Sequence, residues 1–189
     1  MKNYLLLAAS MCLMVGCGSG QKVSQPEKYS QRMVESHGLV DFYCNRHHQT
    51  ELDSASWDYV SGLVANAVLK AWTLYPEKME YYDAVKAFAD NSTTPDGSVI
   101  LNAKGESALR PSNIDDLPAG NVFFTLYKEE LKKGNTKDAN RYKNAASLIR
   151  NKLKYDHSRI PEGLPGAGGF FHKAVYPNQM WLDGLYMGS

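Results

Sequence analysis

Residues 166–189 read G-A-G-G-F-F-H-K-A-V-Y-P-N-Q-M-W-L-D-G-L-Y-M-G-S, and they place one acidic side chain, Asp183, inside a nearly continuous apolar and aromatic run. Gly184 follows it directly, so backbone or substrate could approach closely at this point. Pro177 is compatible with the first turn of a helix, where a missing N–H costs nothing. We therefore expect a helix that begins near Pro177 and carries Asp183 about two turns in.

A carboxylate buried in such a run needs either a partner or a proton. Burying an ionised aspartate without a partner is costly, so its pKa rises unless it is paired. A carboxylic acid with a raised pKa can donate a proton near neutral pH, which makes Asp183 a candidate catalytic acid. The residues leave one alternative open: Asp183 caps a neighbouring loop or pairs with an arginine, and has only a structural role.

The N-terminus has the pattern of a lipoprotein signal. Lys2 precedes an apolar run over residues 4–15, which is too short to span a bilayer and is typical of a secretory signal. Cys17, among small residues, is expected to become the lipidated first residue of the mature chain. We expect a signal peptide over residues 1–17, a polar tether over 18–26, and export to the cell envelope with only a lipid anchor in the membrane. An ordinary cleaved signal or an uncleaved anchor is the alternative.

Composition excludes several classes of function. The 189 residues include 21 Lys and Arg against 20 Asp and Glu, with no basic stripe, so nucleic acid is not an expected partner. Cys12 and Cys17 belong to the signal region, which leaves Cys44 and no disulfide framework or CxxC zinc pattern. The adjacent His47 and His48 would point to different faces of an element, so a shared metal ion is not expected either.

Residues 27–189 are expected to form one all-α domain, because apolar residues recur at three- and four-residue steps. Ser98–Leu101 is a candidate short strand. The predicted helices cover residues 27–37, 57–74, 77–89, 113–133, 136–154, and 177 onward. The N-cap candidates are residues 53–56 for the second of these helices and Asp115 for the fourth.

Long connections over residues 91–112 and 155–176 join the predicted helical hairpins. The candidate functional residues lie where long loops enter helices, and we expect them at one end of the hairpin array. Helix N-termini there suit an anionic ligand, and aromatic side chains suit a sugar ring. The candidates are Trp57, Asp58, Tyr59, Asp115, Asp116, His172, Trp181 and Asp183. The alternatives left open are a plain N-cap role for Asp115 and a core role for Trp57, Tyr59 and Trp181.

Three segments carry a family resemblance. Residues 168–188 closely resemble the signature of the unsaturated rhamnogalacturonyl hydrolases. These enzymes form glycoside hydrolase family 105, which is related to family 88. N-I-D-D-L-P-A-G at 113–120 and W-D-Y-V-S-G at 57–62 fit the same family in the same order. The resemblance implies an (α/α)6 toroid of twelve helices with an acidic and aromatic pocket. The chain holds about five helices and the start of a sixth, so we expect about the first half of that toroid and little or no activity from the isolated chain.

The resemblance also implies a reaction, the hydration of an enol ether. The substrate class is 4,5-unsaturated galacturonic acid at the non-reducing end of pectin and rhamnogalacturonan fragments. Asp183 would protonate the double bond and then activate water, and Asp115 would be the second carboxylate. Lys173 could neutralise the substrate carboxylate. The sugar site would be lined by Tyr59, His172 and Trp181. No metal or organic cofactor is implied.

Two other classes of function stay open from the sequence. One is a surface lipoprotein that binds glycans without chemistry, and the other is a helical interaction module in which Asp183 is structural. The chemistry favours the hydrolase, because protonating a carbon–carbon double bond needs one proton donor and a water. An ordinary glycosidase needs two carboxylates that flank the anomeric carbon. The sequence does not fix the oligomeric state.

Overall fold

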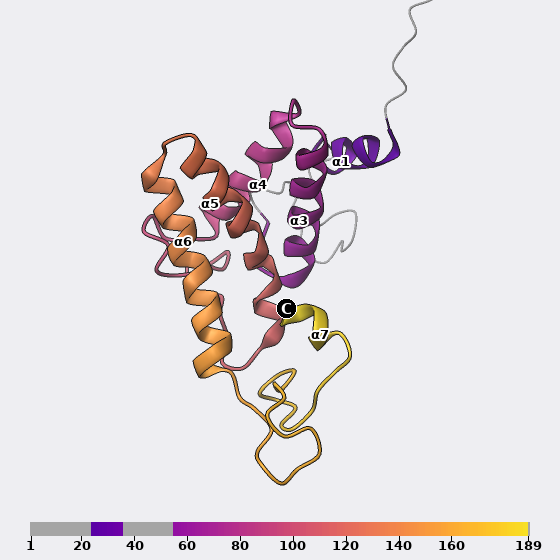
Figure 1. The fold of residues 1–189 in the computed structure, drawn as a ribbon, viewed down its shortest axis with the longest axis vertical. Coiled ribbons are helices and arrows are strands. Elements are labelled where there is room, and N and C mark those ends of the chain that lie inside the picture. The colour runs from indigo at the N-terminus through magenta and orange to yellow at the C-terminus, as the bar shows by residue number, and fades with distance from the viewer. Residues whose placement is uncertain (1–23, 36–54, 189) are drawn as a thin grey trace, which may run out of the picture.

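The computed structural model describes residues 24–35 and 55–188. The signal segment with Cys17, as well as Cys44 and His47–His48, lies outside the described residues. The described part is built from helices joined by loops (Figure 1). The elements are α1 (Gln25–Glu35), α3 (Tyr59–Leu74), α4 (Met79–Asn91), η2 (Ile114–Asp116), η3 (Pro118–Asn121), α5 (Val122–Lys132), α6 (Thr136–Asn151), η4 (Lys152–Asp156) and α7 (Gly184–Met187). Among the described residues, no helix is long and apolar enough to cross a membrane.

Two helical hairpins, α3–α4 and α5–α6, lie side by side and share one core (Figure 1). Trp57, just before α3, stacks on Phe88 of α4 at 5.9 Å between ring centroids and on Phe123 of α5 at 5.6 Å. Offset aromatic stacks of this kind add stability beyond the area that they bury. Trp57 is therefore a core residue, which was one of the two readings open from the sequence.

Buried polar bonds tie the hairpins together. The Tyr82 hydroxyl of α4 donates to Glu130 Oε1 of α5 at 2.5 Å, and the Tyr142 hydroxyl of α6 donates to Asp90 Oδ1 at 2.6 Å. Burial, reinforced by the Glu130 carboxylate, raises the pKa of Tyr82. Burial alone would raise the pKa of Glu130, but hydrogen bonds from Tyr82, Lys133 and other donors outweigh it and hold that pKa below its ordinary value.

Gly62, the last residue of the W-D-Y-V-S-G segment, lets α3 approach η3 closely. A Cβ at this position would lie 2.4 Å from Ala119 Cα, far inside van der Waals contact. The segment that carries η2 and η3 therefore lies directly against the first turn of α3. This contact fixes the place of the N-I-D-D-L-P-A-G turn relative to the rest of the fold.

Several boundaries differ from those predicted. Helix α3 begins at Tyr59 rather than after residues 53–56, because Asp58 is the N-cap and its Oδ1 accepts from the Ser61 N–H at 2.8 Å. Leu63 and Leu74 belong to the apolar residues that recur at three- and four-residue steps in this helix, but both are exposed. Residues 98–101 do not form a strand, and only Ile100 and Leu101 take part in isolated bridges, with Thr93 and Ser107.

The helix predicted over 113–133 is broken into the short turns η2 and η3 before α5 begins at Val122. Asn113, not Asp115, is the N-cap of η2, and its Oδ1 accepts from the Asp115 N–H at 3.3 Å. The prediction of Asp115 as N-cap is wrong, and its carboxylate is available for other partners.

The helix predicted from Pro177 is also shorter than expected. Residues 174–183 run through turns, and α7 begins only at Gly184. Asp183 therefore precedes the helix instead of lying two turns inside it.

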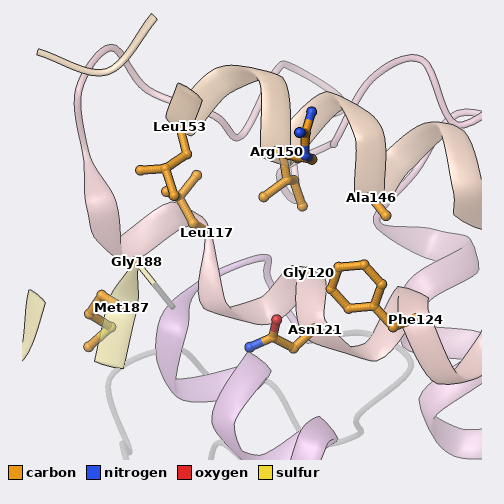
Figure 2. A pocket seen from close by; sticks show the side chains of 10 residues that line it. Leu117, Gly120, Asn121, Phe124, Ala146, Arg150, Leu153, Met187 and Gly188 are labelled. Atoms are coloured by element: carbon orange, nitrogen blue, oxygen red, sulfur yellow. The ribbon is translucent and has the colours of Figure 1, made fainter. Parts of the chain in front are cut away.

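An open apolar groove of about 260 Å³ runs along α5 and α6 and ends at α7 (Figure 2). Phe124 of α5 borders it with 56% of its surface exposed. The groove is lined by Leu117, Gly120, Asn121, Phe124, Ala146, Ile149, Arg150, Leu153, Met187 and Gly188.

Candidate active site

Backbone hydrogen bonds bring the C-terminal segment onto the η2 turn. The Ile114 N–H donates to the His172 carbonyl at 3.1 Å, and the His172 N–H donates to the Gln179 carbonyl at 2.8 Å. Asn113 and Lys173 form an isolated antiparallel bridge beside these bonds. His172 and Lys173 are thus held between two segments that lie far apart in the sequence.

Four charged or titratable side chains form a row at this junction. His172 Nε2 lies 3.6 Å from Asp115 Oδ1, and His172 Nδ1 lies 3.7 Å from Asp183 Oδ1. Lys173 Nζ lies 2.6 Å from Asp115 Oδ2. The two His172 distances are slightly long for hydrogen bonds but well inside the range of strong electrostatic interaction. Among the described residues, no group of three or more Asp, Glu, His or Cys side chains is placed to hold a metal ion.

Burial is unequal along the row. The side chain of His172 is 1% exposed and that of Asp115 is 10% exposed, whereas the side chain of Asp183 is 50% exposed. One carboxylate is therefore fixed inside the protein and the other stands at the surface. The expectation that apolar neighbours sequester Asp183 is wrong, because Leu182 and Leu185 point outward at 85% and 75% exposure.

An aromatic stack covers the imidazole. The Trp181 indole lies parallel to the His172 ring at 4.2 Å between centroids, and Tyr176 stacks on Trp181 at 5.2 Å. Trp181 Nε1 donates to Gln179 Oε1 at 3.2 Å, which fixes the orientation of the indole. Trp181 is 42% exposed, so part of its surface is open to a ligand.

Two glycines of the G-A-G-G segment make room for the side chain of Met180. A Cβ on Gly169 would lie 2.2 Å from Met180 Sδ, and one on Gly166 would lie 2.7 Å from Met180 Cε. Gly166 also has a φ of +81°, a conformation that few other residues adopt. These two positions let Met180 pack against the loop, one residue before Trp181.

Asp116 stabilises the η2 turn and does not belong to the row of charged side chains. Its buried carboxylate accepts a hydrogen bond from the Arg110 backbone N–H at 2.8 Å. It also accepts from the Arg110 guanidinium, at 3.1 Å from Nε and 2.5 Å from Nη2. The Trp57 indole N–H donates to the Asp116 carbonyl at 2.8 Å. A buried carboxylate needs this kind of charged, multiple pairing. Asp116 therefore fixes the backbone from which Asp115 projects.

Sequence reasoning missed Arg110. Hydrogen bonds to Asp116 raise the pKa of Arg110, and the nearby charges of Asp115 and Asp58 add to this effect. Arg110 lies in the irregular segment before η2, where no periodicity or motif distinguishes it from other surface arginines. Only the fold places it against Asp116.

The structure brings together five of the predicted site residues, namely Asp115, His172, Lys173, Trp181 and Asp183. His172 lies beneath Trp181 and is buried, so the indole and not the imidazole presents a surface to a sugar. Tyr59 is exposed in the first turn of α3, next to the capping Asp58. None of its contacts among the described residues ties it to the row.

Comparison with known proteins finds that this chain is similar to a family model and to a solved structure. The model of Glycosyl Hydrolase Family 88 matches residues 31–189. A solved structure, described as a glycoside hydrolase from family 105 of C. acetobutylicum ATCC 824, is similar to this chain with 29% sequence identity and a TM-score of 0.58. The match covers 85% of this chain and 37% of that one, so this chain spans little more than a third of the length of that relative. The predicted all-α fold, a partial (α/α)6 toroid, is confirmed.

Proposed function

The chain belongs to glycosyl hydrolase family 88, and from this membership we propose that its site hydrates the 4,5 double bond of an unsaturated galacturonyl residue. The substrate would be the non-reducing end of a pectin or rhamnogalacturonan fragment. The observation that carries the proposal is the row Asp183–His172–Asp115, in which an accessible carboxyl group stands beside an exposed indole.

Asp183 is the proton donor in this proposal. Its carboxyl proton passes to the double-bond carbon that is remote from the ring oxygen, which leaves a cation shared between the other carbon and that oxygen. A water then adds to the oxygen-bearing carbon, and Asp183 takes back a proton from this water. The resulting hemiketal opens and releases the next sugar, so that one water is consumed and no group stays on the protein.

Lys173 and Asp115 form the second half of the site. An ammonium group has three N–H donors, and the contact with Asp115 Oδ2 uses one of them. The other donors are suited to the carboxylate that every unsaturated uronic acid carries. Asp115, which is nearly buried, fixes Lys173 in place and offers its other oxygen toward His172.

Trp181 supplies the apolar platform. Sugar rings bind through their C–H faces to flat aromatic surfaces, and Trp181 is both partly exposed and locked by its stack on His172. A sugar on this platform would also displace water from the exposed side of Asp183. The apolar surroundings that the sequence predicted for Asp183 would then come from the bound substrate.

Deuterium labelling tests the type of reaction. If the unsaturated disaccharide is turned over in deuterated water, hydration leaves one carbon-bound deuterium at the former double bond, visible by NMR. Direct displacement at the anomeric carbon would instead release an unsaturated monosaccharide, which takes up deuterium only during its later spontaneous tautomerisation and therefore on both faces of that carbon. Label on both faces, or release of the next sugar before the enol-ether absorbance falls, would contradict the proposal. Heat of binding by calorimetry without any turnover would favour a glycan-binding protein.

We also propose that the protein is exported and held at a membrane of the cell envelope by a lipid on Cys17. The support is the sequence pattern of residues 1–20 alone, in which a single lysine, a short apolar run and small residues precede and surround the cysteine. An envelope location suits a protein that acts on fragments of an external polysaccharide.

A further inference from the structure

The His172 ring is buried in an unusual electrostatic position. It is 1% exposed, and its two nitrogens face two different carboxylates, Asp115 and Asp183. Within the part of the chain that the structure describes, His172 Nδ1 is buried without a hydrogen-bond partner. A buried polar atom that is left unpaired is costly, so its position calls for a reason.

The chemistry of imidazole supplies that reason. A neutral ring carries one N–H and can donate to one carboxylate only, whereas the protonated ring carries two and can donate to both. We propose that His172 is a positioning residue that couples the two carboxylates: its protonated ring draws Asp183 toward the buried Asp115, and loss of the proton releases Asp183. The relevance to catalysis rests on the proposed function, but the coupling itself does not.

The His172 ring is held in place, so the property that can change is whether it carries a second proton. The His172 carbonyl accepts from the Ile114 N–H and its own N–H donates to the Gln179 carbonyl, while the indole of Trp181 covers one face. Asp183, by contrast, is half exposed and does not use its side chain to cap α7. Of the two groups in this contact, Asp183 is the one free to move when the charge on His172 changes.

Four charged or titratable groups act on His172. The carboxylates of Asp115 and Asp183 lie 3.6 Å and 3.7 Å from its two nitrogens, and Lys173 offsets the charge of Asp115 at 2.6 Å. His157 lies near enough for an electrostatic interaction, but burial lowers the pKa of His157. His157 is therefore neutral around pH 7 and adds little positive charge.

Trp181 provides a readout of the proton on His172 without any substrate. A protonated imidazole stacked on an indole quenches its fluorescence, and the two rings are parallel at 4.2 Å. We expect the emission of the wild-type protein to fall as the pH drops and His172 takes up a proton. The variants Trp181→Phe and His172→Gln should both lose this transition, which assigns it to this pair of rings among the three tryptophans of the chain.

The pH midpoint of this fluorescence transition measures the coupling between His172 and the two carboxylates. Asp115→Asn and Asp183→Asn should each move the midpoint to lower pH, because each removes an opposite charge within about 4 Å. Lys173→Met should move it to higher pH. If the two carboxylates do not act on the charge of His172, neither aspartate variant moves the midpoint, and that result would overturn the proposal. Circular dichroism confirms that each variant is folded.

Two histidine variants separate this inference from the proposed function. The amide of His172→Asn reaches the position of Nδ1 and keeps a donor toward Asp183, whereas that of His172→Gln reaches the position of Nε2 and faces Asp115. We expect kcat to fall at least tenfold more in His172→Gln than in His172→Asn, with similar KM. Equal kcat values would contradict the positioning role. Because little or no activity is expected from the isolated chain, these are comparisons of residual rates. Wild-type protein that titrates as expected but neither binds nor turns over the unsaturated disaccharide would refute the proposed function and leave the coupling intact.

Discussion

Lys173 Nζ lies 2.6 Å from Asp115 Oδ2, although the two residues come from segments that lie far apart in the sequence and meet at the backbone bridge between Asn113 and Lys173. The pair shows how the fold assembles the site. A turn next to α3 supplies the carboxylate, and a loop close to the C-terminus supplies the cation. In the proposed function, substrate binding draws on this ammonium without any rearrangement of the turn.

Replacing Lys173 by Met should weaken substrate binding more than it slows the chemical step. The substrate carboxylate loses a charged hydrogen-bond donor, so we expect KM for the unsaturated disaccharide to rise about tenfold, which corresponds to about 1.4 kcal/mol. The change in kcat should be smaller. Lys128→Met on the exposed side of α5 is the matched control. An unchanged KM in Lys173→Met would remove this residue from the binding site.

Gly62→Ala should destabilise the fold. The added methyl would lie 2.4 Å from Ala119 Cα, and backbone must move to relieve the clash, so we expect a loss of about 1–3 kcal/mol in the free energy of unfolding. Urea denaturation followed by circular dichroism measures it. Gly184→Ala in α7, where a Cβ meets nothing within 4 Å, should cost nothing or add slight stability. Equal effects of the two substitutions would argue against close packing of α3 on η3.

Acidification should weaken the link between the two hairpins. The folded-state pKa of Glu130 is held below its ordinary value of 4.5, so the unfolded chain takes up a proton first as the pH falls. The contribution of Glu130 to the free energy of unfolding is therefore fully present at neutral pH and is lost progressively below about pH 4.5. Tyr82→Phe removes one of the responsible hydrogen bonds and should flatten this part of the stability–pH curve. Tyr155→Phe, at an exposed position, should leave the curve unchanged.

Cys17→Ser should release the protein from membranes if the lipoprotein interpretation is right. We expect the wild type in the membrane fraction of cells that express the full sequence, and the Cys17→Ser variant in the soluble envelope fraction or retained as an uncleaved precursor. Labelling with a fatty-acid analogue should mark the wild type only. Cys44→Ser is the control. Label on Cys17→Ser, or wild type in the soluble fraction, would contradict the lipid anchor.

Much of the helical order could be predicted because its signals are local. Gly134, with a φ of +75°, ends the α5 region as predicted, and Pro76 follows the end of α3 at Leu74. The three motif segments also indicated which residues would meet, since Asp115, His172 and Asp183 do lie together. Spacing and motif chemistry carry this kind of information without the fold.

The remainder depends on contacts that a sequence does not specify. Apolar residues around Asp183 predicted a buried acid, but periodicity does not say which surface would cover them, and Leu182 and Leu185 face outward. The choice of Asn113 over Asp115 as N-cap depends on whether η2 starts as a 3-10 turn. Arg110 could not be assigned, because its pairing with Asp116 is set by the path of an irregular loop.

The residual rate at which the enol-ether absorbance of an unsaturated disaccharide disappears, compared between wild type and Asp183→Asn, tests the central claim most directly. The measurement uses a high protein concentration, because little activity is expected from the isolated chain. The amide preserves size and hydrogen bonding but cannot donate a proton to carbon, so we expect a rate at least about 100-fold lower than wild type. Asp156→Asn, at an exposed carboxylate of η4, should match the wild type. Hydration by Asp183→Asn at the wild-type rate would show that another group supplies the proton, and would contradict the mechanism.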